Sequence, residues 1–138
     1  MDDKQKLIVQ LAREWLGVKY VHQGRSKEHG CDCIAPAISV GKKLGMEISD
    51  ITNYSRLPQG TLLKDKFESH CIRISKADIQ PGDIVLILTK QFNHVGIIGD
   101  YHQGGLSLIH SYSSVGKVVE HFLDEKWMNR ISRAYRVP

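Results

Sequence analysis

The sequence has little of what would set it apart from an ordinary globular domain. Of its 138 residues, 3 are cysteine, 4 are proline and 7% are aromatic, which excludes a disulfide-built scaffold and a proline-rich repeat. No apolar run approaches the ~18 residues that a membrane-spanning helix needs, so we expect no membrane span. The first six residues, MDDKQK, are too polar and acidic for a secretory signal. We therefore expect synthesis in the cytoplasm.

An excess of charge of one sign is also nearly missing. Lys and Arg number 19 against 15 Asp and Glu, giving a formal charge of +4 that favours anionic partners: nucleic acid, acidic lipid or carboxylate-bearing wall polymers. Because the basic residues are dispersed and form no nucleic-acid-binding arm, we expect no nucleic-acid partner. The length fits one core, which predicts a single domain over residues 1–138. The sequence does not specify an oligomeric state.

Helical patterns come first in the chain. Apolar spacing predicts an amphipathic helix from Asp3 to Leu16, closed by Gly17. A second helix is predicted from Cys33 to Leu44. Pro36 places its start close to Asp32 or Cys33, because proline is tolerated only in the first turn. Residues 60–70 are predicted as a third helix, after an irregular stretch over residues 50–59.

Strand-like runs follow the helices. Five strands are predicted: Ile84–Leu88, His94–Gly99, Leu106–Tyr112, Lys117–Phe122 and Ile131–Val137. Helices grouped before strands favour an α+β domain with an antiparallel sheet over alternating βαβ units.

Cys33 is the first candidate for chemistry. At the start of a helix, unpaired backbone N–H groups favour the thiolate, which predicts a lowered pKa and a nucleophilic sulfur. The same N–H groups can form part of an oxyanion hole. A lone cysteine is more commonly a small buried apolar residue, so position alone leaves both interpretations open.

Two histidines on neighbouring predicted strands are candidates for a base. A hairpin centred on His102 pairs His94 with His110, close enough for one ring to orient the other. A register slip of one residue would put them on opposite faces of the sheet. Together with Cys33 they supply nucleophile, base and orienting group, the minimum set for cysteine acyl transfer.

The other thiols and imidazoles carry weaker signals. A zinc site drawn from His29, Cys31, Cys33 and His94 would need an unusual one-residue spacing between its cysteines, so we expect no metal. Cys31 is open between a core position and a disulfide. We interpret four further histidines as solvated: His22, His70, His102 and His121. We interpret Trp15 and Trp127 as packing residues.

Five short motifs are spread over nearly the whole chain. They are AREWLGVKY (12–20), GCDCIA (30–35), PGDIV (81–85), HVGI (94–97) and IHS (109–111). In this order they resemble the NlpC-type family of bacterial cell-wall cysteine peptidases. The resemblance implies a papain-like α+β fold, with N-terminal helices packed on about five strands. It also implies hydrolysis of amide bonds in peptidoglycan stem peptides, with no cofactor.

The resemblance also implies residue roles. Cys33 would be the nucleophile, His94 the general base and His110 the group that orients His94. Tyr20 would place its hydroxyl near the oxyanion, and Asp32, directly before the nucleophile, would serve the oxyanion or the substrate; Asp32 is also a candidate helix cap.

The same chain departs from the family at residues 34–36, where Ile-Ala-Pro replaces the usual serine, glycine and apolar residue, and this puts the substrate preference beside the thiol in question.

Residues 118–123 and 127–138 further resemble the branch encoded by tailed phages and prophages. That branch implies phage tail proteins as partners and delivery to the cell wall on a particle or by lysis. Two alternatives stay open: a catalytically silent tail or wall-binding module, and a thiol acyltransferase.

Overall fold

The computed structural model describes residues 1–48, 50, 62–89 and 93–138. Its four α-helices in this part are α1 (Asp3–Arg13), α2 (Ala35–Lys43), α3 (Leu62–His70) and α4 (Glu125–Arg130). A single 3₁₀ turn, η1, spans Lys76–Asp78. The irregular stretch predicted over residues 50–59 lies outside the described residues except for Asp50. None of the described helices is long and apolar enough to cross a bilayer.

The strands form two antiparallel sheets. The main sheet has the order β3-β8-β4-β5-β6-β7, and β1 pairs with β2 in a separate two-stranded ribbon. The strand bounds are β1 (Arg25–Ser26), β2 (Gly30–Cys31), β3 (Ile72–Ile74), β4 (Ile84–Leu88), β5 (Asn93–Asp100), β6 (Leu106–Tyr112), β7 (Lys117–Phe122) and β8 (Ile131–Arg136). The α+β prediction is confirmed. The main sheet has six strands instead of five, because β3 is a three-residue, largely exposed edge strand with no buried pattern to read.

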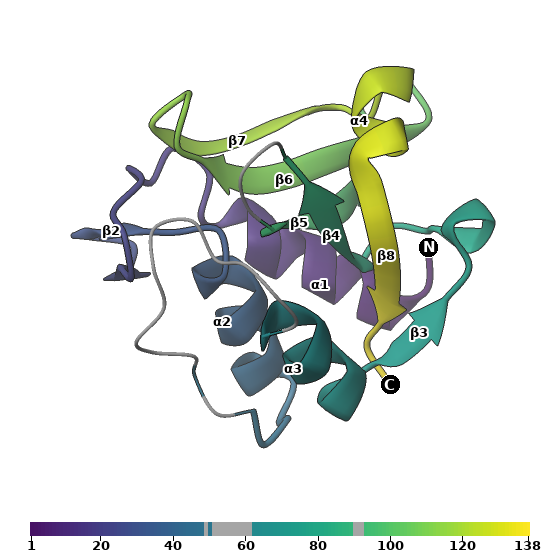
Figure 1. Ribbon diagram of the computed structural model, residues 1–138, viewed down its shortest axis with the longest axis horizontal. Helices are drawn as coiled ribbons and strands as arrows, with labels where there is room; N and C mark the ends of the chain where they lie inside the picture. Colours follow the sequence, from purple (N-terminus) through teal and green to yellow (C-terminus); the bar gives the residue numbers. More distant parts are fainter. Residues whose placement is uncertain (49, 51–61, 90–92) are drawn as a thin grey trace.

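The two faces of the main sheet have different covers. Residues of α1, α2 and α3 form one apolar core with β4, β5 and β6, with Trp15, Ile38, Phe67, Leu86, Val95 and Ile97 among its members. Figure 1 shows these three helices gathered on one side, with α4 at the other end of the molecule beside the start of β8. A smaller core on the opposite face contains Val85, Ile87, Ile98 and Leu108, and α4 packs against it through Trp127 and Met128.

The first helix is capped at its N-terminus and ends earlier than its apolar pattern predicts. Asp2 accepts from the backbone of Gln5 at 2.8 Å, and the Gln5 side chain accepts from the backbone of Asp2 at 2.8 Å, a reciprocal capping box. At the other end, the backbone N–H groups of Trp15 and Leu16 bond to carbonyls three residues back. This tightened turn ends α1 at Arg13, three residues before the predicted end.

The second helix begins later than predicted. Its first residue is Ala35, because the chain at residues 32–34 is held by the Asp32 carboxylate. Asp32 Oδ1 accepts from the N–H groups of Ile34 (3.0 Å) and Ala35 (3.3 Å). Cys33 therefore lies just ahead of α2, while Pro36 lies in its first turn as predicted.

The register between β5 and β6 differs from the predicted hairpin. A turn centred on His102 would pair Ile97 with Ser107, whereas Ile97 pairs with Ile109 and Ile98 with Leu108. The shift is two residues along β6, because the turn between the strands is centred one residue further on. A two-residue shift preserves which side chains share a face. His94 and His110 therefore stay on one face but are not direct partners.

Gly30 opens β2 where a side chain does not fit. Its φ is +124°, and a Cβ would lie 2.3 Å from Val21 Cγ2 and 3.0 Å from the carbonyl oxygen of Lys19. The close approach brings residues 19–21 alongside β2, which leads directly into Cys33.

We expect Gly30→Ala to lower the free energy of unfolding by about 3 kcal/mol, since backbone strain and overpacking each cost about 1–3 kcal/mol. Gly45→Ala is the matched control, because Gly45 also has a positive φ (+80°) but nothing within 4 Å of its added Cβ. That control should lose only about 1 kcal/mol from backbone strain. Urea unfolding measures both, and equal losses would contradict the clash with Val21.

Candidate active site

The Cys33 thiol lies where two neighbouring strands separate. The β5–β6 pairs run from Asp100–Leu106 to Ile97–Ile109 and go no further toward His94. In this region the backbone N–H of Val95 faces the Cys33 sulfur closely enough to lower the pKa of the thiol. Because Val95 follows His94 directly, the contact holds the thiol against the backbone beside the His94 side chain. The structure thus places the predicted nucleophile beside the strand that carries the predicted base, against the residue that follows His94.

Three histidine rings form a hydrogen-bonded line that begins at His94. His94 Nε2 lies 2.6 Å from His110 Nδ1, and His110 Nε2 lies 2.8 Å from His121 Nε2. At the far end, His121 Nδ1 lies 2.9 Å from the backbone carbonyl oxygen of Phe122. His94 and His110 are 2% exposed, whereas His121 is half-buried. The predicted contact between His94 and His110 is therefore present, and it continues to a third histidine.

Aromatic side chains enclose this line. The Tyr112 ring lies 5.7 Å from the His94 ring and stacks on His110 at 5.3 Å, as measured between centroids. Trp127 of α4 contacts His110 edge-on at 5.1 Å and His121 at 5.3 Å. These contacts restrict the histidine rings and exclude water from the two buried ones.

Asp32 is held by the protein itself. Besides the amides at the start of α2, it accepts from the backbone N–H of Gln23 (3.1 Å) and pairs with Arg25 Nη1 (2.9 Å). Arg25 Nε in turn pairs with Asp50 at 2.9 Å. Asp32 is 1% exposed. The structure therefore assigns Asp32 a capping and loop-fixing contact set, as the cap hypothesis expects; its role toward substrate stays a prediction.

Tyr20 is placed by backbone contacts next to the nucleophile segment. Tyr20 forms a parallel bridge with Cys31, and its N–H donates to the carbonyl of Gly116 at 2.8 Å. The flanking amide of Val21 donates to the Cys31 carbonyl at 3.0 Å. The Tyr20 side chain is half-buried, and its bridge partner Cys31 lies two residues before Cys33 in the chain. Its predicted role at the oxyanion remains a prediction.

The acidity of the thiol differs from the sequence-based expectation. Burial, with a smaller contribution from the neighbouring Asp32 charge, raises the pKa of Cys33 to about 12, and the Val95 amide offsets only part of this rise. The predicted lowering is wrong mainly because the thiol is buried; the Asp32 carboxylate also takes the helix-start amides and adds a negative charge beside the sulfur. In the resting chain the thiol is therefore protonated at neutral pH.

The two buried histidines are neutral. Burial lowers the pKa of His94 to about 3 and that of His110 to about 2, with smaller contributions to the latter from the neighbouring His94 and His121. Each ring therefore carries one proton at neutral pH, so one nitrogen of each ring donates and the other accepts.

The remaining thiols take part in no metal cluster. All three cysteines are free; Cys31 is fully buried, which favours its core interpretation, and Cys71 is half-buried. Among the described residues, no three His, Cys, Asp or Glu side chains are grouped to hold a metal ion.

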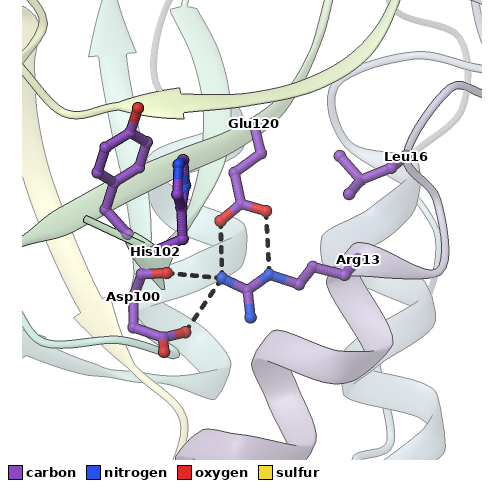
Figure 2. Close-up of a pocket in the computed structure, with 6 residues that line it drawn as sticks. Arg13, Leu16, Asp100, His102 and Glu120 are labelled. Atoms are coloured by element: carbon purple, nitrogen blue, oxygen red, sulfur yellow. Dashed lines mark hydrogen bonds and ion pairs between the residues drawn. The ribbon is translucent and has the colours of Figure 1, made fainter. Parts of the chain in front are cut away.

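A surface hollow of about 520 Å³ lies away from Cys33. It is lined by Arg13, Leu16, Asp100, Tyr101, His102 and Glu120. Figure 2 shows the Arg13 guanidinium between two carboxylates: Arg13 bonds to Glu120 through Nε (2.9 Å) and Nη2 (2.8 Å), and to the Asp100 carbonyl at 2.7 Å. Because these charges pair with each other, we interpret the ion pairs that line the hollow as structural contacts that join α1, β5 and β7.

Sequence analysis missed His121, which it interpreted as a solvated histidine. The position of His121 depends on the register of the hairpin formed by β6 and β7, which the sequence alone did not give. β6 and β7 pair His110 with Val119 and Leu108 with His121. His121 is thus on the same face as His110 and diagonal to it, within reach of a side-chain contact. Trp127 was expected to be a packing residue, and it packs, but against the histidines.

A helix-preceding cysteine set against an antiparallel sheet that carries two buried histidines defines a papain-like fold. The chain also matches the model of the NlpC/P60 family over residues 17–136. It therefore belongs to the NlpC/P60 family, in agreement with the resemblance found in its motifs. A search of curated proteins gives no match.

Solved structures share this fold at low sequence identity. The NlpC/p60 domain of the peptidoglycan hydrolase SagA is 24% identical, with a TM-score of 0.68, and covers 96% of this chain and 98% of its own. A lipoprotein-like NLP/P60 protein from Staphylococcus aureus is 20% identical (TM-score 0.66; 99% of this chain, 42% of its own). An N-acetylmuramoyl-L-alanine amidase from Bacteroides uniformis is 17% identical (TM-score 0.56; 99% of each chain). This chain thus spans about two fifths of the staphylococcal structure.

We predict that stability falls as the pH drops below about 6.5, the ordinary pKa of an unfolded histidine. His94 and His110 have lowered pKa values when folded, so their contribution is present above pH 6.5 and is lost as the pH falls toward 3. Each neutral buried histidine gives a slope of about 1.4 kcal/mol per pH unit in this range. Urea unfolding at pH 7.5, 6.0 and 5.0 measures it.

The variant His110→Gln removes one titrating group and should reduce this slope by about one proton. His102→Gln is the control, because His102 is exposed and lies outside the histidine line. A free energy of unfolding that stays level from pH 7.5 to 5.0 in the parent would contradict the neutral, buried state of both rings.

Proposed function

We propose that this chain is a cell-wall hydrolase, specifically a cysteine peptidase that cleaves amide bonds in peptidoglycan stem peptides. The observation that carries the proposal is the contact set at the parting of β5 and β6. In support of it, the Cys33 sulfur lies against the Val95 amide, one residue from His94, and the His94 ring lies 2.6 Å from His110. A nucleophile, a base and an orienting group in this relation are the elements of thiol acyl transfer.

The reaction starts from a neutral thiol and a neutral imidazole. Because His94 uses Nε2 toward His110, its Nδ1 is the nitrogen assigned to the thiol proton. As His94 takes that proton, the Cys33 sulfur attacks the carbonyl carbon of the substrate amide. The raised pKa of Cys33 favours proton transfer coupled to attack over a thiolate that exists before substrate binds.

The developing oxyanion needs hydrogen-bond donors at the same turn. The amides of Ile34 and Ala35 already donate to Asp32, so we assign the Cys33 backbone N–H, which lies against its own sulfur, as the donor of this turn. We assign the Tyr20 hydroxyl as the second donor, since the Tyr20 backbone is bridged to Cys31. Asp32 contributes by holding this turn in shape.

Collapse of the intermediate returns the proton. The C–N bond of the substrate breaks, and His94 Nδ1 donates its proton to the leaving amine, leaving a thioester on Cys33. Water, deprotonated by His94, then attacks the thioester carbon. The C–S bond breaks, His94 returns the proton to the Cys33 sulfur, and the product leaves as a carboxylic acid that ionises in solvent. The chain's own residues supply every proton transfer in this scheme.

Two lines of support point to peptidoglycan as the substrate. The NlpC/P60 structures similar to this chain include the peptidoglycan hydrolase SagA, and the B. uniformis neighbour is an amidase of the muramoyl-L-alanine bond. A net charge of +4 also favours an acidic polymer. A stem-peptide amide and the muramoyl-L-alanine amide are therefore the bonds to compare.

Association with phage tail proteins and delivery by a particle or by lysis stay predictions from the C-terminal residues. The assignment of residues 1–138 to one catalytic domain is likewise a proposal. The family match over residues 17–136 supports it.

We expect Cys33→Ala to reduce digestion of purified peptidoglycan by about 10³-fold or more, because the covalent intermediate cannot form. Cys71→Ala is the matched control and should digest at the parent rate, since Cys71 is a half-buried thiol outside the site. Mass spectrometry of the products identifies the cleaved bond, and ¹⁸O-labelled water separates hydrolysis from acyl transfer.

Three outcomes bear on the proposal. Equal digestion by Cys33→Ala and the parent would overturn the mechanism. No digestion by the folded parent would favour the silent wall-binding module. A free muramic acid carboxylate with an intact peptide would assign amidase activity instead of endopeptidase activity.

A further inference from the structure

His121 closes the histidine line with a contact of fixed direction. Its Nδ1 lies 2.9 Å from the Phe122 carbonyl oxygen, and a carbonyl oxygen only accepts hydrogen bonds. Nδ1 of His121 must therefore carry a proton. In a neutral His121 the other nitrogen, Nε2, then has none and accepts from His110 at 2.8 Å.

The direction passes from ring to ring. Because His110 Nε2 donates to His121, a neutral His110 has no proton on Nδ1, and that nitrogen accepts from His94 Nε2. A neutral His94 that donates through Nε2 has its lone pair on Nδ1. One backbone carbonyl thus determines the tautomer of three side chains.

We infer that His121 is a positioning residue that holds His94 in the tautomer with a basic Nδ1, acting through His110. This role rests on the proposed function, in which that nitrogen takes the thiol proton. Without His121 as an acceptor, His110 could carry its proton on Nδ1, and His94 would then present a protonated Nδ1 to the thiol and could not act as a base. His110 alone orients the His94 ring but does not determine which nitrogen carries the proton.

The same line also carries charge away from the buried base. When His94 Nδ1 has gained the thiol proton, the Nε2 proton of His94 moves to His110 Nδ1, and the Nε2 proton of His110 moves to His121 Nε2. His94 and His110 are then neutral with protons on Nδ1, and His121 holds both of its protons and the positive charge. No proton is gained or lost. The charge thereby moves from a ring that is 2% exposed to a half-buried one.

The surroundings of His121 keep this arrangement in place. Trp127 packs against His121 at 5.3 Å and against His110 at 5.1 Å, which restricts both rings. His121 contacts His110, the Phe122 carbonyl and Trp127, and Arg130 of α4 lies over the Trp127 ring at 5.0 Å. An aromatic replacement at position 121 therefore preserves packing while removing the acceptor.

The test combines a spectroscopic and a kinetic measurement. ¹⁵N histidine spectra at pH 8 distinguish Nδ1–H from Nε2–H tautomers, and at that pH ordinary histidines are neutral. In the parent we expect the Nε2–H tautomer of His94. His121→Phe should give a mixture or the Nδ1–H tautomer, and kcat on a muropeptide should fall by about 10- to 100-fold, the loss typical of partners that orient metal-bound histidines, with KM little changed.

Two variants serve as controls. His121→Gln supplies both an acceptor and a donor and should retain the parent tautomer and most of kcat. His102→Phe makes the same substitution at an exposed histidine outside the line and should change neither.

An unchanged His94 tautomer in His121→Phe, or an Nδ1–H tautomer in the parent, would overturn the inference. If the parent shows the expected tautomer but cleaves no muropeptide, the positioning by His121 stands and the proposed function falls.

Discussion

The contact between the Val95 amide and the Cys33 sulfur depends on an interruption in the sheet. β5 and β6 pair as far as Ile97 and Ile109 and then part, so that the amide beyond the last pair is available to a group outside the sheet. The thiol occupies that position. The segment that delivers it is fixed by the close approach at Gly30 and by the buried carboxylate of Asp32. An interruption in backbone pairing thus creates the position at which a nucleophile and a base meet.

Burial places opposite demands on this site. Low dielectric surroundings keep the Cys33 thiol and the His94 imidazole neutral, which stabilises the fold, yet the proposed reaction must separate charge between them. Aromatic rings from Tyr112 and Trp127 maintain the dry environment. The histidine line can carry the charge out of this environment, since it leads from the dry interior to a ring near solvent. Substrate binding then needs to favour only the short proton transfer from the Cys33 thiol to His94.

The sequence predicted most of what depends on local pattern. The α+β class and the positions of all five predicted strands, to within one residue, follow from periodicity, and the motifs carried the family and the candidates Cys33, His94 and His110. What it could not give depends on tertiary contacts. The late start of α2 follows from the Asp32 carboxylate, and the raised pKa of Cys33 follows from burial of the thiol and, to a smaller extent, from the Asp32 charge; neither burial is visible in the local sequence. The position of His121 follows from a register, and a shift of two residues is enough to change neighbours without changing faces.

The contacts of Arg13 have a consequence for cooperativity. Its guanidinium joins the last residue of α1 to Glu120 of β7 and to Asp100 at the end of β5, three elements that are distant in the chain. A helix cross-linked in this way cannot fray from its C-terminal end without also breaking contacts with the sheet. Local opening of α1 should therefore approach the global unfolding transition, and amide hydrogens of α1 and β5 should exchange with solvent as one unit.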